Sequence, residues 1–164
     1  MMSRRTTLLR LGALSGILAG MRSLLGSSQA HAARAYEVTR TDAEWQKLLK
    51  SVQYRVLRKA GTERPYSSPL DKEKRVGVFS CAGCALPLFS SKTKFESGTG
   101  WPSFWQPMEK AVVEETDTTL LMKRTEVLCR RCGGHLGHVF DDGPKPTGLR
   151  YCMNGVAMNF TAAS

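Results

Sequence analysis

Five cysteines carry the clearest chemical signal in this 164-residue sequence. Four of them form two C-x-x-C pairs, CAGC at 81–84 and CRRC at 129–132, and the fifth stands alone in GLRYCMNG. Two such pairs offer four thiolates suited to a tetrahedral metal site, and all-thiolate ligation favours zinc over iron. We therefore expect one structural zinc ion and no organic cofactor, with four ligands: Cys81, Cys84, Cys129 and Cys132.

Two other interpretations of the paired cysteines stay open. One pair could be a redox-active dithiol of the thioredoxin kind, although that motif usually lies near a βαβ unit and these pairs have β-rich surroundings. Alternatively, the first pair could be unused and one metal could be held within CRRCGGHLGH by Cys129, Cys132, His135 and His138. The four-cysteine site is preferred because it uses both pairs.

The unpaired Cys152 is either a small core residue or a reactive thiol. If RYCMN is extended, Arg150, Cys152 and Asn154 project from one face of the strand. A guanidinium beside a thiol favours the thiolate, which is the nucleophilic form, and Asn154 would add a hydrogen-bonding neighbour. This placement makes Cys152 a candidate nucleophile.

Two further stretches contain residues that could assist such a thiol. His135 and His138 lie three residues apart in GGHLGHVFDDG, and histidine is suited to give or take a proton near neutral pH. SGTGWPSFW places Trp101 and Phe104 in a loop where they could form an aromatic wall. Both sets could instead be ordinary core or surface residues.

Residues 41–61, near the start of the mature sequence, predict helix. Thr41 and Glu44 have the spacing of a capping box, and the helical pattern runs to a stop at Gly61 with a break near Ser51. One apolar face is expected from Trp45, Leu48, Leu49 and Val52.

From residue 76 onward, short apolar runs alternate with glycine, proline and aspartate, which is typical of strands. The runs are VGVF, LPLF, AVVEE, TLLMKRTEVL and VAMNF, and DDGPKPTG at 141–148 reads as a loop. The expected fold is mainly β, with two antiparallel sheets, short N-terminal helices and the zinc site.

Residues 1–32 resemble a cleavable twin-arginine export signal, and 33–164 would form a single domain. Arg4 and Arg5 precede an apolar stretch, Leu11 to Met21, that is about half of the roughly 20 residues needed to span a bilayer, and small residues follow. We expect a periplasmic or otherwise exported protein with no stable membrane partner, an organelle transit peptide being the alternative. Removing the four arginines of this segment would reduce the formal charge from +10 to +6.

The motifs CAGC, TKFESGTGWPSF, CRRCGGHLGHVFDDGPKPTGLRYCMN and YRVLRKAGTERPYSS resemble those of the B-class methionine-R-sulfoxide reductases. The resemblance covers roughly residues 41–160. It implies a tent of two antiparallel sheets and an enzyme that reduces the R epimer of methionine sulfoxide, free or in oxidised proteins.

The resemblance also assigns roles to individual residues. Cys152 would attack the sulfoxide sulfur and become a sulfenic acid, and His135 and His138 would bind and protonate the sulfoxide oxygen. Arg150 and Asn154 would adjust the thiolate. Substrate binding would involve Trp101, which contacts the terminal methyl group, with Phe140 and Asp142 in the pocket wall.

One position departs from the family. Many B-class members have a resolving cysteine where this chain has Thr99, and the other four cysteines are assigned to zinc. We therefore expect an external thiol, either a thioredoxin-like dithiol or a small thiol, to reduce the sulfenic acid directly.

Two other classes of function compete with this interpretation. A zinc-stabilised binding module would need its 24 Lys and Arg clustered with aromatics between them, but they are scattered, so no nucleic-acid partner is expected. A thiol peroxidase would use a lone cysteine but would give Trp101 and the histidines no role. The expected assembly is a monomer.

Overall fold

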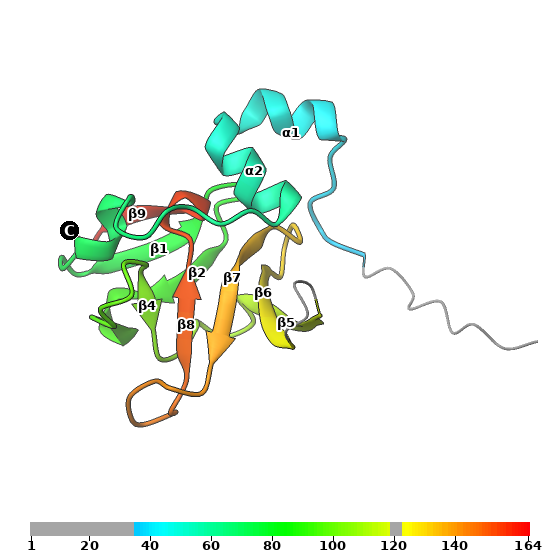
Figure 1. Ribbon diagram of the computed structural model, residues 1–164. Helices are drawn as coiled ribbons and strands as arrows, with labels where there is room; N and C mark the ends of the chain where they lie inside the picture. The colour runs from blue at the N-terminus through cyan, green and yellow to red at the C-terminus, as the bar shows by residue number, and fades with distance from the viewer. Residues whose placement is uncertain (1–34, 119–122) are drawn as a thin grey trace, which may run out of the picture. The chain divides into compact units, whose positions relative to one another are not determined.

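Two antiparallel sheets form the body of the protein in the computed structural model, which describes residues 35–118 and 123–164 (Figure 1). The expected export signal at 1–32 lies outside this range. The small sheet has the order β2-β1-β9 and the large sheet has the order β3-β4-β8-β7-β6-β5. Within the described residues no helix has the length and apolar character needed to cross a membrane.

The strands of the small sheet are β1 (Gly77–Cys81), β2 (Pro87–Ser90) and β9 (Met158–Ala162). The large sheet contains β3 (Lys94–Phe95), β4 (Ser103–Phe104), β5 (Val112–Asp117), β6 (Arg124–Cys129), β7 (His135–Phe140) and β8 (Arg150–Met153). There are also three short 3-10 helices: η1 (Pro69–Lys72) precedes β1, η2 (Ser91–Thr93) lies between β2 and β3, and η4 (Gly155–Ala157) lies between β8 and β9. The prediction of a mainly β fold with two antiparallel sheets is confirmed.

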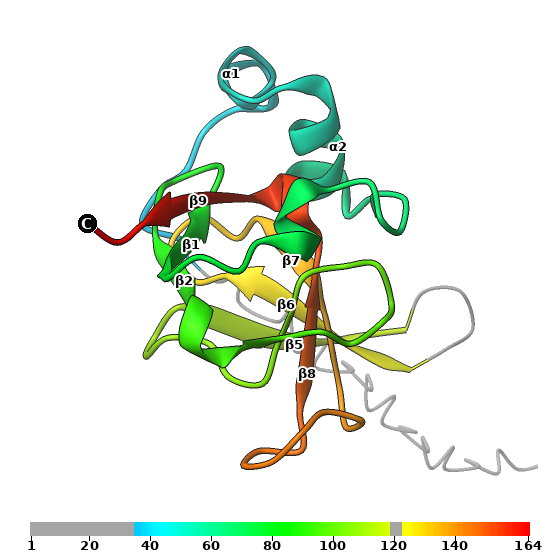
Figure 2. The same cartoon turned by 90° about the vertical axis from the view of Figure 1, so that its left-hand side faces the viewer.

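Two α-helices, α1 (Asp42–Leu48) and α2 (Ser51–Lys59), cover one end of the sheets (Figure 2). The capping box is present: Glu44 N–H donates to Thr41 Oγ1, and the Glu44 carboxylate accepts from Thr41 N–H. The chain is extended at Leu49 and Lys50, which confirms the break near Ser51.

The predicted apolar face is wrong in part, because helical spacing does not continue through this extended break. Trp45 and Leu49 are buried, whereas Leu48 and Val52 are 53% and 36% exposed. The end of the second helix also differs by one residue from the predicted stop at Gly61. Ala60, and not Gly61, takes the left-handed conformation at φ 49°, and the Gly61 N–H bonds to the carbonyl of Arg55.

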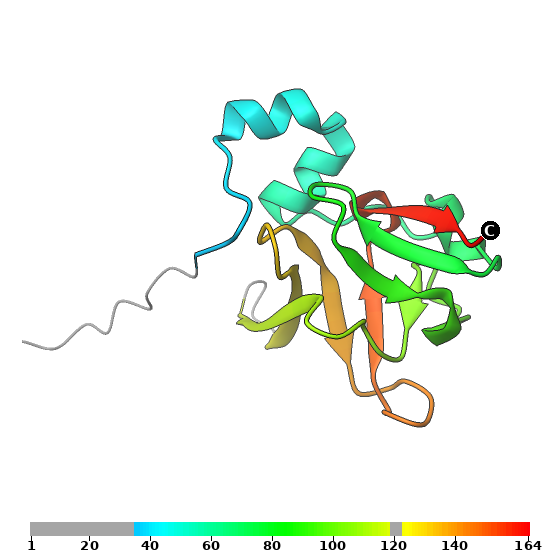
Figure 3. The ribbon, with the colours of Figure 1, turned by 180° about the vertical axis from the view of Figure 1, so that it is seen from behind.

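Buried side chains from both sheets form one core. The view from behind shows how the two sheets lie against each other (Figure 3). Phe89 of the small sheet stacks on Phe104 of the large sheet with centroids 4.3 Å apart, and Phe79 meets Phe104 edge-on at 4.9 Å. Tyr151 and Met153 of β8 point into this core. Because side chains alternate along a strand, Arg150 and Cys152 point to the opposite face of the large sheet.

The apolar runs predicted the strands unevenly. VGVF, LPLF and AVVEE correspond to β1, β2 and β5, but VAMNF begins in η4 and only its end is strand. In TLLMKRTEVL the strand β6 begins at Arg124, and residues 119–122 lie outside the description. The loop expected at 141–148 is present between β7 and β8.

Candidate active site and metal centre

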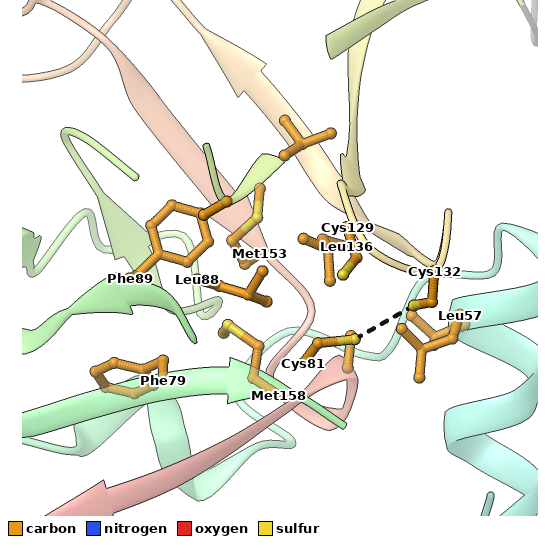
Figure 4. Packing of buried hydrophobic residues seen from close by; sticks show 14 of the residues in the cluster. Leu57, Phe79, Cys81, Leu88, Phe89, Cys129, Cys132, Leu136, Met153 and Met158 are labelled. Atoms are coloured by element: carbon orange, nitrogen blue, oxygen red, sulfur yellow. Dashed lines mark hydrogen bonds between the residues drawn. The ribbon is translucent and has the colours of Figure 1, made fainter. Parts of the chain in front are cut away.

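The four paired cysteines converge at one side of the core. Figure 4 shows three of them, Cys81, Cys129 and Cys132, close to Leu57 of α2. Their sulfur atoms all lie within 4.8 Å of one another, with 3.7 Å between Cys81 and Cys132 and 3.5 Å between Cys84 and Cys129. A tetrahedral zinc with bonds of about 2.3 Å would separate its sulfurs by about 3.8 Å. The cluster can therefore hold one metal ion, and its all-sulfur chemistry fits zinc.

Each C-x-x-C pair sits in a tight turn between two strands, one joining β1 to β2 and the other joining β6 to β7. Two arginines form hydrogen bonds with the backbone of these turns: Arg58 of α2 donates to the Cys132 carbonyl at 2.9 Å, and Arg131 donates to the Cys84 carbonyl at 3.2 Å. Hydrogen bonds with the neighbouring thiols raise the pKa of Cys81, and burial adds to the effect. A cation among the sulfurs would reverse this by stabilising the thiolates.

The alternative metal set, which used the two histidines, is not assembled. His135 Nδ1 lies 2.5 Å from Glu126 Oε1, and His138 Nε2 lies 2.8 Å from Asp117 Oδ2. The second cysteine pair is instead grouped with the first.

Cys152 opens onto a small cavity on the outer face of the large sheet. It is half-buried on β8 and is paired directly across from His138 on β7. The cavity has a volume of about 170 Å³, below the ~300–1000 Å³ of most small-molecule sites, so it suits one side chain better than a nucleotide. Its wall consists of Thr62, Trp101, Arg124, Gly137, His138, Phe140, Cys152 and Asn154.

A β-bulge brings both histidines to this face. Strands β6 and β7 pair regularly as far as Val127↔Gly137. The next residue of β6, Leu128, pairs with His135, so Leu136 of β7 has no partner of its own on β6 and forms the bulge. Leu136 points into the core, and the rings of His135 and His138 meet at 5.4 Å. Without the bulge, residues three apart on a strand would face opposite ways.

The carboxylates beside the histidines determine their tautomers, because a carboxylate only accepts hydrogen bonds. His135 therefore donates from Nδ1 and His138 donates from Nε2. Burial lowers the pKa of His138, and the hydrogen bond to Asp117 opposes that effect. His135 Nε2 is buried and has no hydrogen-bond partner within the described part of the chain.

Arg150 was expected to favour the thiolate of Cys152, but the net shift has the other sign. Burial raises the pKa of Cys152, and the smaller effects of Thr99 and Arg150 oppose it. Arg150 also makes a two-pronged bond to the carboxylate of Asp142, at 2.8 Å for both contacts, and its guanidinium lies 4.5 Å from the ring centroid of Phe140. Asp142 thus fixes the guanidinium of Arg150 by this ion pair and does not line the cavity.

The remaining expected residues are placed around the thiol. Trp101 is in the cavity wall, whereas Phe104 belongs to the core. Asn154 also reaches the wall, but its side chain accepts from the Glu63 N–H at 2.9 Å and donates to the Leu136 carbonyl at 3.0 Å. Thr99 Oγ1 lies 3.9 Å from Cys152 Sγ.

Comparison with known proteins decides the family. Residues 49–162 match the SelR domain. The chain is 53% identical over 126 residues to the peptide methionine sulfoxide reductase MsrB of Leptospira interrogans, covering 76% of this chain and 96% of that protein. It is 56% identical over 124 residues to the MsrB of Methanosarcina barkeri, covering 75% and 87%. The chain belongs to the MsrB family.

Several residues that build this MsrB site carry no recognisable local signal. Arg124 and Thr62 line the cavity, and Asp117 and Glu126 hold the histidines. All of them come from segments distant in sequence from Cys152. GTERPYSS was part of the family resemblance, which would have been the one clue to Thr62 and its neighbour Glu63.

Proposed function

We propose that this protein reduces the R epimer of methionine sulfoxide, free or within oxidised proteins, to methionine, with Cys152 as nucleophile. The observation that supports this most is the pairing of Cys152 with His138 across β7 and β8, at a cavity walled by Trp101. A thiol, a proton donor and an apolar surface for a methyl group are the three elements that the reaction needs.

In the first step, the thiolate sulfur of Cys152 attacks the sulfoxide sulfur. The sulfoxide oxygen accepts a proton from an imidazolium of the pair His135 and His138, whose charge the carboxylates of Glu126 and Asp117 would stabilise. The oxygen passes to Cys152, the thioether methionine is released, and Cys152 is left as a sulfenic acid. The sulfoxide is reduced by two electrons and the cysteine is oxidised by two.

An external thiol then regenerates the enzyme. It attacks the sulfenic acid to give a mixed disulfide and water, and a second thiol attacks that disulfide to restore Cys152 and release an oxidised disulfide. Two features support this route: the other four cysteines are grouped within 4.8 Å of one another, and the side chain 3.9 Å from the Cys152 sulfur at position 99 is the hydroxyl of Thr99 and not a thiol. Trapping an intramolecular disulfide of Cys152 during turnover would contradict it.

The test is turnover of the separate R and S epimers of a methionine sulfoxide peptide, with dithiothreitol as reductant. We expect reduction of the R epimer alone and its abolition by Cys152→Ser. Glu109→Gln, an exposed carboxylate with a side chain 88% accessible, is a matched surface control that should retain full rate. Absence of turnover on both epimers in a folded, metal-bound protein would refute the proposal.

We further propose that the metal is zinc and that it stabilises the fold without entering the reaction. Four thiolates complete a tetrahedron and leave no open position for a substrate. Elemental analysis of purified protein tests this directly: one zinc per chain is expected, and an iron-loaded chain of equal stability would contradict it.

Export rests on the sequence of residues 1–32. We propose that this segment directs the folded protein out of the cytoplasm and is then removed. Arg4→Lys together with Arg5→Lys should retain the uncut chain in the cytoplasm, and an unchanged distribution would argue against a twin-arginine signal.

A further inference from the structure

Glu63 is a buried carboxylate beside the cavity that the proposed reaction does not use. It is 4% exposed and lies in the segment between α2 and η1. Its Oε1 accepts from the N–H of Gly155 at 2.5 Å and its Oε2 accepts from the N–H of Val156 at 3.1 Å. These amides begin η4, the turn that directly follows the strand carrying Cys152.

The backbone of the same residue makes two more bonds to cavity residues. Its N–H donates to Asn154 Oδ1 at 2.9 Å, and its carbonyl accepts from the indole Nε1 of Trp101 at 3.2 Å. Through Asn154, which also donates to the Leu136 carbonyl, the network reaches β7. Glu63 thus connects two walls of the cavity that come from different parts of the chain.

The turn η4 is packed closely against the segment that carries Glu63. A side chain at Gly155 would overlap Ser68 Oγ and would meet Glu63 Oε1 at 3.3 Å, so the turn is pressed directly against the carboxylate. Burial raises the pKa of Glu63, and the two amide hydrogen bonds oppose this effect. An apolar residue would avoid this cost of burial, but it could not bind both amides.

We propose that Glu63 is a positioning residue that sets the distance between Trp101 and the turn after Cys152, and so the width of the cavity. The inference rests on the proposed function. Glu63 makes its bonds to Trp101, Asn154 and the η4 amides, so its effect falls on substrate binding. The reactivity of the thiol depends on burial, Thr99 and Arg150, which Glu63 does not contact.

The test compares Glu63→Gln and Glu63→Ala with the unmodified protein. Gln retains one acceptor for the two amides and Ala retains none, so KM for a methionine-R-sulfoxide peptide should rise in that order. The loss of one hydrogen bond to a charged group corresponds to about a tenfold increase in KM for Glu63→Gln. The rate of Cys152 alkylation by iodoacetamide should stay unchanged.

Glu73→Gln is the matched control. The Glu73 side chain is only 13% exposed, but its carboxylate binds the guanidinium of Arg75 and not a residue of the cavity wall. Its KM should equal that of the unmodified protein. A double variant with Trp101→Phe adds a second readout, because Glu63→Gln should raise KM less once the indole N–H is absent.

KM separates this role from a merely structural one, since partial unfolding lowers the apparent kcat of a sample but leaves the KM of the folded fraction unchanged. An active enzyme with unchanged KM in Glu63→Gln would overturn the inference alone. An unmodified protein inactive on both epimers would overturn the proposed function, and the inference with it.

Discussion

Replacing Asp117 by Asn should reduce catalysis and move its pH profile toward acid. The proposed chemistry needs a Cys152 thiolate and a protonated histidine at once. Ordinary pKa values of about 8.5 for cysteine and about 6.5 for histidine leave that combination in about 1% of molecules between those pH values. Burial raises the pKa of Cys152 and lowers that of His138, so the productive fraction is smaller still.

Asp117 is the group that opposes this loss at His138. The Nε2–Oδ2 distance is 2.8 Å, and the side chains of His138 and Asp117 are only 13% and 10% exposed, so solvent screens the pair weakly. A hydrogen bond to a charged group of this kind is worth about 1.5–3 kcal/mol, equivalent to about 10- to 100-fold in the protonated fraction of His138. Asp117→Asn should therefore lower the plateau of kcat/KM by about that factor.

The sign of the pH effect follows from the same bond. Asp117 raises the pKa of His138, so its removal lowers that pKa, and the acidic limb of the kcat/KM profile should shift to lower pH. The basic limb, which reflects Cys152, should stay in place. Measuring kcat/KM from pH 5 to pH 10 with Glu109→Gln as control tests this. An acidic limb that stays fixed or moves to higher pH would refute the reasoning.

Three further changes test other parts of the molecule. Removing the metal with a chelator should lower the midpoint of thermal unfolding and zinc should restore it, because the cluster links two hairpins; an unchanged midpoint would contradict a structural role. Thr99→Cys places a second sulfur about 3.9 Å from that of Cys152, so turnover should form a disulfide between these two residues, and a thiol assay should show the loss of both of their thiols. Thr99→Ser should form no such disulfide. Ala60→Gly relieves a left-handed alanine and should raise the free energy of unfolding by about 1 kcal/mol in urea titration, while no gain would show that the helix end is unstrained.

The metal cluster could be predicted from the sequence because its signal is local. Each C-x-x-C pair forms its own turn, and two pairs supply a complete ligand set. The face of Cys152 was predictable for a similar reason, since alternation along RYCM needs only the strand itself. Arg150 and Cys152 do face away from the core, as Tyr151 and Met153 face into it.

The electrostatics of the thiol were not predictable in this way. The neighbouring guanidinium is visible in the sequence, but the burial that outweighs it comes from distant segments packed on the same face. Trp101 and Thr62 lie about fifty and ninety residues before Cys152, and both close the cavity around it. Asp142 then draws Arg150 into a separate ion pair. Proximity along the chain therefore overstated the influence of Arg150.

The histidine pair shows a further limit of local patterns. HLGH on a regular strand would send His135 into the core and keep His138 on the active face. The extra residue Leu136 reverses this, because it takes the inward position and turns His135 outward. Gly137 allows the bulge to lie against β8, since a side chain there would overlap the carbonyl oxygen of Cys152. The same short motif thus supplies both histidines, the bulge that puts them on one face and the close approach that places His138 beside the nucleophile.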